Sequence, residues 1–216
     1  MKFNAAIFDL DGTLLDSMGM WASLCPDFLN RHGIKAGIEV NAKIGVPSVR
    51  GAIRWMLETY NIAADEEEVY RQVWDEITCF YSEKVSLKPG IIPILEKLKK
   101  AGIPAGLVTA TENGLLKHAL RRVGLLDYFG SNILSCAETN LSKATPEPFM
   151  IMTEILNSTP EKTIVFEDAF YAANTARTHG FNVAAVYDRF EFHQEKLQQC
   201  ANWYCREWDD FPLEII

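Results

Sequence analysis

Short apolar runs alternate with amphipathic stretches along most of the chain. The apolar runs end in a polar residue or a turn, and their length and lack of strict alternation predict buried strands at residues 3–9, 103–109, 132–136, 163–168 and 181–187. Amphipathic stretches with apolar residues three and four positions apart lie between these runs and predict helices at residues 91–100, 112–123 and 146–156. Strands that alternate with helices predict an α/β fold, in which a parallel sheet is covered on both faces.

Residues 17–85 break this alternation. They carry helical periodicity throughout and no convincing strand, so we predict three or four helices inserted after the first strand. The acidic run 65–68 is typical of a helix's first turn, where negative charge is favourable. The predicted division is therefore a core of residues 1–15 and 88–216 and a helical cap of residues 16–87, joined by linkers near Asp16 and Lys88-Pro89-Gly90.

The composition and net charge of the chain exclude several classes of protein. The 216 residues are 48% hydrophobic and 23% charged, which is ordinary for a folded globular protein, and this length predicts one domain or a domain with one substantial insertion. No apolar run reaches the roughly 18 residues of a membrane span, and the first residues lack a secretory signal, so we expect no membrane partner. A net charge of −8 disfavours nucleic acid. Five cysteines without metal or disulfide spacing indicate reduced thiols in a cytoplasmic protein, and a monomer is the simplest expectation.

The segment Phe8-Asp-Leu-Asp-Gly-Thr-Leu-Leu-Asp-Ser17 carries the strongest chemical signal. Asp9 and Asp11 stand two residues apart at the end of a predicted strand, so their side chains point the same way if the chain stays extended. Gly12 lets the backbone turn toward a bound anion. The alternative is a polar turn in an acidic protein.

Polar residues also end other predicted strands. Thr109, followed by the amide of Ala110, ends one strand, and Glu167-Asp168 ends another. Lys143 stands just before a helix opened by Pro146. Singly, each has an ordinary explanation as a helix cap or a surface lysine. A parallel sheet would nevertheless bring these strand ends to one edge, where ligands of such folds bind.

The order of these motifs resembles the haloacid dehalogenase superfamily of phosphohydrolases and phosphomutases. DxDGT comes first, then the helical insertion, Val108-Thr109, the lysine before a proline-opened helix, and the Glu-Asp pair. The resemblance covers essentially the whole chain, and it is greatest to the subfamily with an all-helical cap, which includes phosphoglycolate-phosphatase-like and β-phosphoglucomutase-like members. It implies a Rossmann-like parallel sheet core with an inserted all-α cap.

The resemblance also implies roles for the acidic residues. Asp9 would be the nucleophile that carries the phosphoryl group as an acyl phosphate. Asp11 would be the general acid and base. A Mg²⁺ ion would be held by Asp9, by the backbone carbonyl of Asp11, and by Glu167 and Asp168, a set of hard oxygen ligands that suits this ion.

Phosphate contacts follow from the same resemblance. Thr109, Ala110 and Lys143 would bind phosphate oxygens and neutralise their charge. In the cap, residues 43–48 resemble the family's substrate-specificity loop, with Gly45 in it and Arg50 nearby as an anion contact. A glycine turn between two cap helices explains the same residues equally well.

The implied function is a Mg²⁺-dependent phosphatase that hydrolyses a small phosphorylated metabolite, such as a sugar phosphate, through an aspartyl-phosphate. Thr13 favours this interpretation, because the mutases tend to replace that threonine with valine or alanine. A phosphomutase of the β-phosphoglucomutase type is the alternative. A non-catalytic phosphate-binding protein on the same fold is a third hypothesis, whose mark would be loss of Asp9, Asp11 or Lys143, and all three are present.

Overall fold

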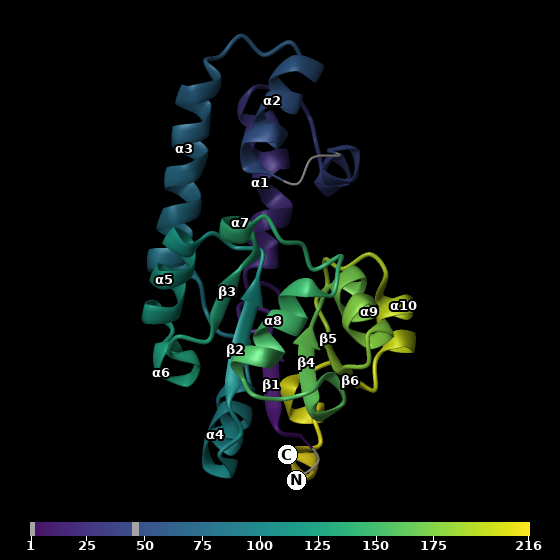
Figure 1. Ribbon diagram of the computed structural model, residues 1–216. Coiled ribbons are helices and arrows are strands. Elements are labelled where there is room, and N and C mark those ends of the chain that lie inside the picture. The colour runs from purple at the N-terminus through teal and green to yellow at the C-terminus, as the bar shows by residue number, and fades with distance from the viewer. Residues whose placement is uncertain (1–2, 45–47) are drawn as a thin grey trace.

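A six-stranded parallel sheet forms the centre of the protein (Figure 1). The computed structural model describes residues 3–44 and 48–216. The strand order is β3-β2-β1-β4-β5-β6, and the strands are β1 Ala5–Phe8, β2 Ala105–Thr109, β3 Ile133–Ser135, β4 Thr163–Glu167, β5 Asn182–Val186 and β6 Trp203–Cys205. The first five strands lie at the predicted positions, which confirms the predicted α/β class.

Helices cover both faces of this sheet because alternate strand residues point to opposite sides. In β1, Ala6 and Phe8 belong to one apolar core, whereas Ala5 and Ile7 belong to another. The first core is completed by α4 Ile91–Ala101, α5 Asn113–Arg122 and α6 Leu126–Phe129. The second is completed by α7 Cys136–Thr139, α8 Glu147–Ile155, α9 Phe170–Thr178 and α10 Gln194–Cys200.

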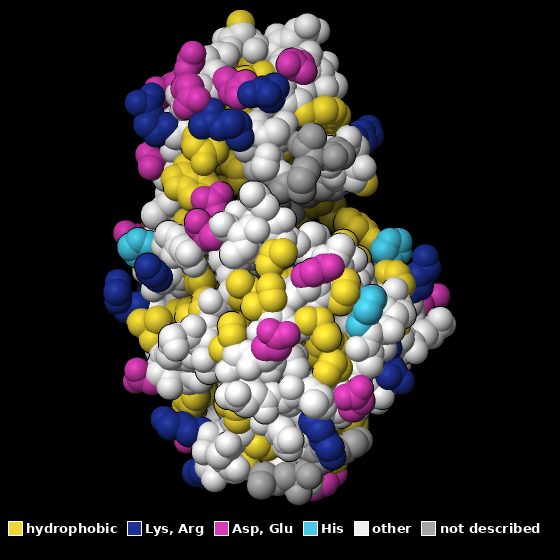
Figure 2. All heavy atoms as spheres, viewed as in Figure 1, with side chains coloured by type: hydrophobic (Ala, Val, Ile, Leu, Met, Phe, Trp, Pro, Cys, Tyr) yellow, Lys and Arg dark blue, Asp and Glu magenta, His cyan; other side chains and the backbone are white. Residues whose placement is uncertain are grey.

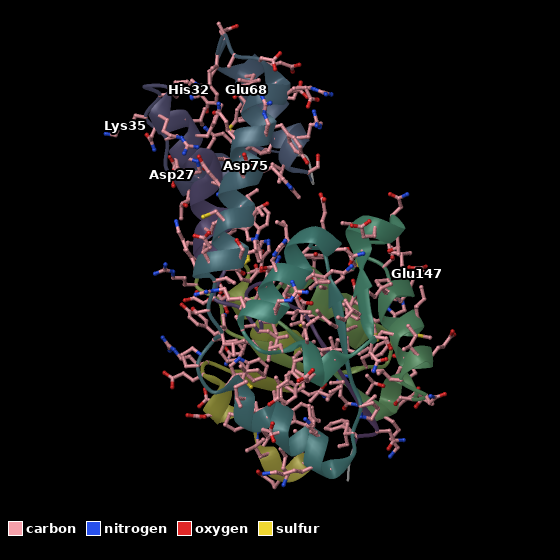
Figure 3. The ribbon with its side chains drawn as sticks, turned by 90° about the vertical axis from the view of Figure 1, so that its left-hand side faces the viewer. Asp27, His32, Lys35, Glu68, Asp75 and Glu147 are labelled. Atoms are coloured by element: carbon pink, nitrogen blue, oxygen red, sulfur yellow. The ribbon has the colours of Figure 1, made fainter. Side chains whose placement is uncertain are left out.

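A helical lobe stands on the carboxyl-end edge of the sheet (Figures 1 and 3). Its elements are α1 Met18–Arg31, the 3₁₀ helix Ile38–Lys43, α2 Val49–Thr59, α3 Glu66–Cys79 and a π-helical turn, Phe80–Lys84. Asp65 caps α3 by accepting a hydrogen bond from the amide of Glu68, at 2.9 Å. The acidic run therefore begins that helix, as predicted.

Two chain segments join the lobe to the core, and they pair with each other. The amide of Asp16 donates to the carbonyl of Ser86 at 3.0 Å, and the amide of Lys88 donates to the carbonyl of Leu14 at 2.8 Å. The backbone thus crosses between the two parts as a short two-stranded ladder. Asp16 and Lys88 of this ladder belong to the predicted linkers, and the division of the chain into two domains stays a prediction.

The sequence did not predict the last strand, β6, or the helix α10 that precedes it. β6 has only three residues and pairs on one side alone, with β5, so its apolar run is too short to stand out. All five cysteines are free thiols. None of the helices in the described part of the chain has the length and apolar character that a membrane crossing requires.

Candidate active site

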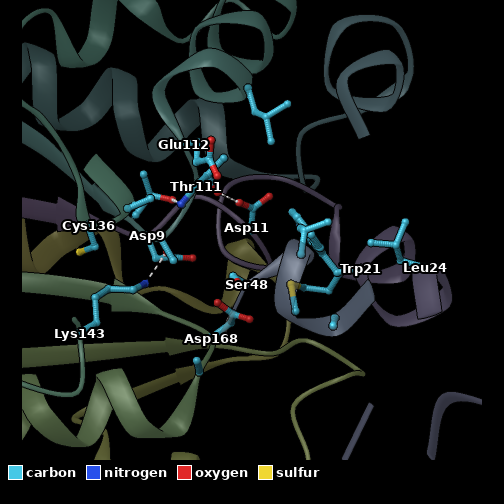
Figure 4. Close-up of a pocket in the computed structure, with 18 of the residues that line it drawn as sticks. Asp9, Asp11, Trp21, Leu24, Ser48, Thr111, Glu112, Cys136, Lys143 and Asp168 are labelled. Carbon is cyan, nitrogen blue, oxygen red and sulfur yellow. Dashed lines mark hydrogen bonds and ion pairs between the residues drawn. The ribbon is translucent and has the colours of Figure 1, made fainter. Parts of the chain in front are cut away.

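The predicted acidic residues meet at the carboxyl-end edge of the sheet (Figure 4). Asp9 follows β1 directly, Thr109 ends β2, and Glu167 ends β4, next to β1 in the sheet. Lys143 comes from the segment between α7 and α8 and reaches the same edge. These residues line a cavity of about 850 Å³ between the core and the helical lobe.

Lys143 bridges two of the carboxylates. Its Nζ donates to Asp9 Oδ1 at 2.5 Å and to Glu167 Oε2 at 2.8 Å, and all three side chains are buried. Burial alone would lower the pKa of Lys143, but the charges of Asp9 and Glu167 raise it well above the ordinary value. The lysine is therefore a fixed positive charge beside Asp9.

Asp9, Glu167 and Asp168 form a cluster that suits a divalent cation. Each offers one carboxylate oxygen, and these oxygens lie within 4.8 Å of one another. Burial raises the pKa of both Glu167 and Asp168, and the negative charge of Asp9 raises both further. Three buried carboxylates against one ammonium leave excess negative charge, which a cation with hard oxygen ligands offsets. The backbone carbonyl of Asp11, the other predicted metal ligand, stays a prediction.

The loop after β1 supports this cluster. Thr13 is fully buried, and its hydroxyl donates to Asp168 Oδ1 at 3.0 Å. Gly12 has φ +84°, and a Cβ added to it would lie 2.1 Å from Asp168 Oδ2. Gly12 is thus required both for the turn and for space beside Asp168. The sequence analysis anticipated the turn but not the contact between Thr13 and Asp168.

Three hydroxyl groups hold the carboxylate of Asp11. Ser17 donates to Oδ1 at 2.6 Å, Tyr81 donates to the same oxygen, and Thr111 donates to Oδ2. Burial raises the pKa of Asp11, while these hydrogen bonds act in the opposite direction. None of the three donors was predicted as a site residue. Ser17 was the one that the sequence could have offered, because it closes the DxDGT segment itself.

The predicted phosphate contacts lie at this edge as well. Thr109 and Ala110 line the cavity, and the hydroxyl of Thr109 accepts a hydrogen bond from the amide of Thr111 at 3.0 Å. The Thr109 side chain is thereby oriented within the site. Binding of phosphate by Thr109 and Ala110 stays a prediction.

The part of the cavity wall formed by the lobe is mainly apolar. Its apolar residues are Met18, Trp21, Leu24, Cys25, Ile44, Val49, Ala52 and Trp74. The structure does not bring Arg50 to this wall. Both guanidinium ends of Arg50 bond to Glu67, and its Cζ lies 4.0 Å from the centre of the Tyr70 ring. Figure 2 shows such basic and acidic side chains next to one another over α2 and α3. Gly45 lies outside the described residues.

A family comparison agrees with this arrangement. The model of the haloacid dehalogenase-like hydrolases matches residues 3–180, which includes every predicted residue of the core site. The chain belongs to the haloacid dehalogenase-like hydrolase family. The resemblance proposed from the motifs is thereby confirmed.

Two relatives carry the names of phosphatases. The chain is 29% identical to the "Phosphorylated carbohydrates phosphatase" of Thermotoga maritima over 177 residues, 82% of this chain and 81% of that protein. It is 28% identical to "Hexitol phosphatase A" of Escherichia coli over 187 residues, 86% of this chain and 84% of that protein. These findings support a phosphoric monoester hydrolase.

A solved structure shares the fold. The crystal structure of β-phosphoglucomutase from Clostridium difficile superimposes with a TM-score of 0.73, covering 98% of this chain and 94% of that one, at 22% identity. At this identity the likeness concerns the fold alone. The same architecture thus serves both phosphatases and mutases, so the choice between them depends on the site.

Proposed function

We propose that this protein is a Mg²⁺-dependent phosphatase that hydrolyses a small phosphorylated metabolite through an aspartyl-phosphate. The observation that carries the proposal is the buried cluster in which Asp9 contacts Lys143 and lies beside Glu167 and Asp168. A nucleophilic carboxylate, a fixed cation and a metal-ligand set within one edge of a sheet are what phosphoryl transfer needs. The membership of the family supports the same reaction class.

Asp9 is the proposed nucleophile. Its carboxylate attacks phosphorus, the bond to the leaving oxygen breaks, and the phosphoryl group becomes an acyl phosphate. Lys143 would stabilise the attacked group, because Asp9 and Glu167 already hold its ammonium, 2.5 Å from Asp9 Oδ1. Bound Mg²⁺ would neutralise phosphate charge and so let two anions approach, held by Asp9, Glu167 and Asp168.

Asp11 is the proposed general acid and base. In the first step its proton passes to the leaving oxygen, and in the second its carboxylate takes a proton from the attacking water. Burial raises the pKa of Asp11, which favours the protonated form that the first step needs. Both carboxylates line the same cavity, as the two-step reaction requires.

The charge of the cavity favours hydrolysis over a mutase reaction. Among the described residues that line it, Lys143 is the one cationic side chain, and residues 45–47 are Gly, Val and Pro, which carry no charge. A mutase passes through a bisphosphorylated intermediate, whose second phosphate would then face the apolar wall of the lobe. Burying an anion without a partner is strongly unfavourable. A substrate with one phosphate and an uncharged remainder fits this cavity better.

The proposal includes a monomeric protein in the cytoplasm with a diffusible substrate. Its five free thiols are typical of a reducing compartment. A net charge of −8 disfavours nucleic acid as a partner. Size-exclusion chromatography with light scattering checks the oligomeric state.

The decisive experiment is a panel of phosphorylated sugars, hexitols, nucleotides and small acids, assayed for phosphate release with Mg²⁺. We expect release from uncharged sugar or polyol monophosphates, and loss of it in the Asp9→Asn variant and in EDTA. Phosphate release retained by Asp9→Asn in a preparation free of other phosphatases would contradict the assignment of the nucleophile. Sugar 1-phosphates are followed for the isomeric 6-phosphate as well. If the isomer forms faster than phosphate is released, the protein is a phosphomutase and the proposed hydrolysis is wrong.

A further inference from the structure

The hydroxyl of Tyr81 lies between the helical lobe and Asp11. It donates to Asp11 Oδ1 and accepts a hydrogen bond from Trp21 Nε1 at 2.9 Å. Trp21 belongs to α1, at the beginning of the lobe, and Tyr81 belongs to the π-helical turn that ends it. The three residues therefore form a chain of hydrogen bonds from the lobe to the proposed acid and base.

The direction of these bonds follows from the groups themselves. An indole N–H only donates, and an ionised carboxylate only accepts. The single proton of the Tyr81 hydroxyl must therefore point to Asp11, with Trp21 donating to the oxygen behind it. When Asp11 is ionised, as the proposed second step requires, each neighbour has one role and the hydroxyl has one orientation.

The ring that carries this hydroxyl is held firmly. Tyr81 is 0% exposed, and its ring packs edge-on against Phe80, with 5.6 Å between ring centres. A π-helical turn is rare, and such turns are frequent at functional sites. The turn also leads directly into the two-stranded ladder that joins the lobe to the core, where Asp16 bonds to Ser86. A displacement of the lobe therefore moves the hydroxyl relative to Asp11.

We infer that Tyr81 is a positioning residue for the general acid and base: its hydroxyl, fixed by Trp21, orients the Asp11 carboxyl together with Ser17 and Thr111 and couples it to the position of the lobe. The inference rests on the proposed function, because it takes Asp11 as the group that protonates the leaving oxygen. Tyr81 does not line the cavity, so it acts through Asp11 and not on the substrate.

The effect of a Tyr81 substitution on the reaction rate should depend on the leaving group if Tyr81 positions Asp11. A general effect on the packing of the protein would not depend on it. An alkoxide needs a proton to leave, whereas p-nitrophenolate is stable enough to leave without one. A misplaced Asp11 therefore slows the first step for an alkyl phosphate and spares p-nitrophenyl phosphate. Water attack on the acyl phosphate is common to both substrates, so the first step must be measured by itself.

The experiment compares Tyr81→Phe with the wild type in single-turnover quench, with saturating Mg²⁺. The substrates are p-nitrophenyl phosphate and the alkyl phosphate of the panel that reacts fastest. General acid–base catalysis contributes about 10²–10⁴-fold, so we expect loss of its positioning to slow alkyl release about tenfold and p-nitrophenolate release less than about twofold. Tyr128→Phe is the matched control, because its hydroxyl also donates to a carboxylate, Glu96, but far from the cavity. It should change neither rate.

Equal slowing of both substrates, no slowing, or faster alkyl release would overturn the inference. Trp21→Phe provides a second variant, which removes the donor to the hydroxyl but also changes the cavity wall, so only the ratio of the two rates is compared; it carries the test if Tyr81→Phe does not fold. Trp21→Phe should lower the rate of alkyl release relative to that of p-nitrophenolate release, as Tyr81→Phe does. The double variant should have the same ratio of these two rates as Tyr81→Phe alone. A wild-type protein that is inactive on the whole panel would refute the proposed function. If the wild type is active but Tyr81→Phe does not slow alkyl release more than p-nitrophenolate release, this inference alone is refuted.

Discussion

Removing a charge from the metal cluster should stabilise the metal-free protein. Asp168→Asn keeps the shape of the side chain, and its amide oxygen can still accept the hydrogen bond from Thr13. The wild-type carboxylate is buried, and burial first, then the charges of Asp9 and Glu167, raise its pKa well above the usual value. Ionised Asp168 therefore destabilises the fold whenever no cation is bound.

The size of this effect follows from two opposing contributions. An uncompensated buried charge costs about 3–5 kcal/mol. A hydrogen bond to a charged group returns about 1.5–3 kcal/mol, and Asp168 has such a bond from Thr13. The difference is about 2 kcal/mol. We expect Asp168→Asn to raise the free energy of unfolding by about this amount in EDTA at pH 8.

The pH dependence has a defined sign. In the unfolded chain Asp168 ionises near its ordinary pKa of 3.8, whereas in the folded protein the pKa is raised. Below the unfolded pKa both states are protonated, so wild type and Asp168→Asn should be equally stable. As the pH rises above it the unfolded state ionises first, and wild-type stability is lost up to the folded pKa. The gap between the two proteins therefore widens from about pH 4 upward.

Urea unfolding in EDTA and in Mg²⁺ measures this prediction. A ligand at 100 times its Kd adds about 2.7 kcal/mol to the wild type, whereas the variant has lost one ligand and gains less. The advantage of the variant should therefore shrink when Mg²⁺ is added. Asp188→Asn is the matched control, because Asp188 is buried but paired with Lys88 at 2.9 Å. It should lose about 1–3 kcal/mol in both buffers. An Asp168→Asn protein less stable than wild type in EDTA at pH 8 would refute the reasoning.

Three further variants probe the same site. Gly12→Ala should weaken Mg²⁺ affinity and lower stability by more than about 1 kcal/mol in urea unfolding, because φ is +84° and the new Cβ would press on Asp168. Thr13→Val should reduce kcat or metal affinity about 10–100-fold in phosphate-release titrations, because Asp168 loses its orienting bond. Lys143→Met should abolish turnover and cost about 3–5 kcal/mol in EDTA, because it leaves Asp9 and Glu167 without their cation.

Most of the core of the site was predictable because its acidic residues and Thr109 stand at or directly after strand ends. Asp9, Thr109 and Glu167 follow or end β1, β2 and β4, and the parallel order of these strands brings them together without any knowledge of side-chain packing. Lys143 comes from an irregular segment, and only the family pattern made it stand out. The strand β6 was missed because its three residues lie at the sheet edge, where one neighbour suffices.

The surroundings of Asp11 were not predictable in the same way. Tyr81 lies 70 residues further along the chain, and its helical spacing marks it as an ordinary apolar position of the lobe. Its hydroxyl matters only because the lobe folds back over the sheet edge. Arg50 shows the reverse case, since a basic residue beside the specificity loop suggests an anion contact. In the structure Glu67 holds both ends of its guanidinium group.

The stability of the site and its chemistry depend on the same imbalance of charge. Asp9, Glu167 and Asp168 surround one ammonium, so the metal-free cluster holds more negative charge than its buried position favours. That excess would supply affinity for a divalent cation, and in the proposed mechanism the cation would allow a phosphate dianion to enter. The side chain of Asp11 is not part of this carboxylate cluster and is held by three neutral hydroxyls. In the proposed mechanism, the side chain that transfers the proton, Asp11, is therefore distinct from the carboxylates proposed to hold the metal.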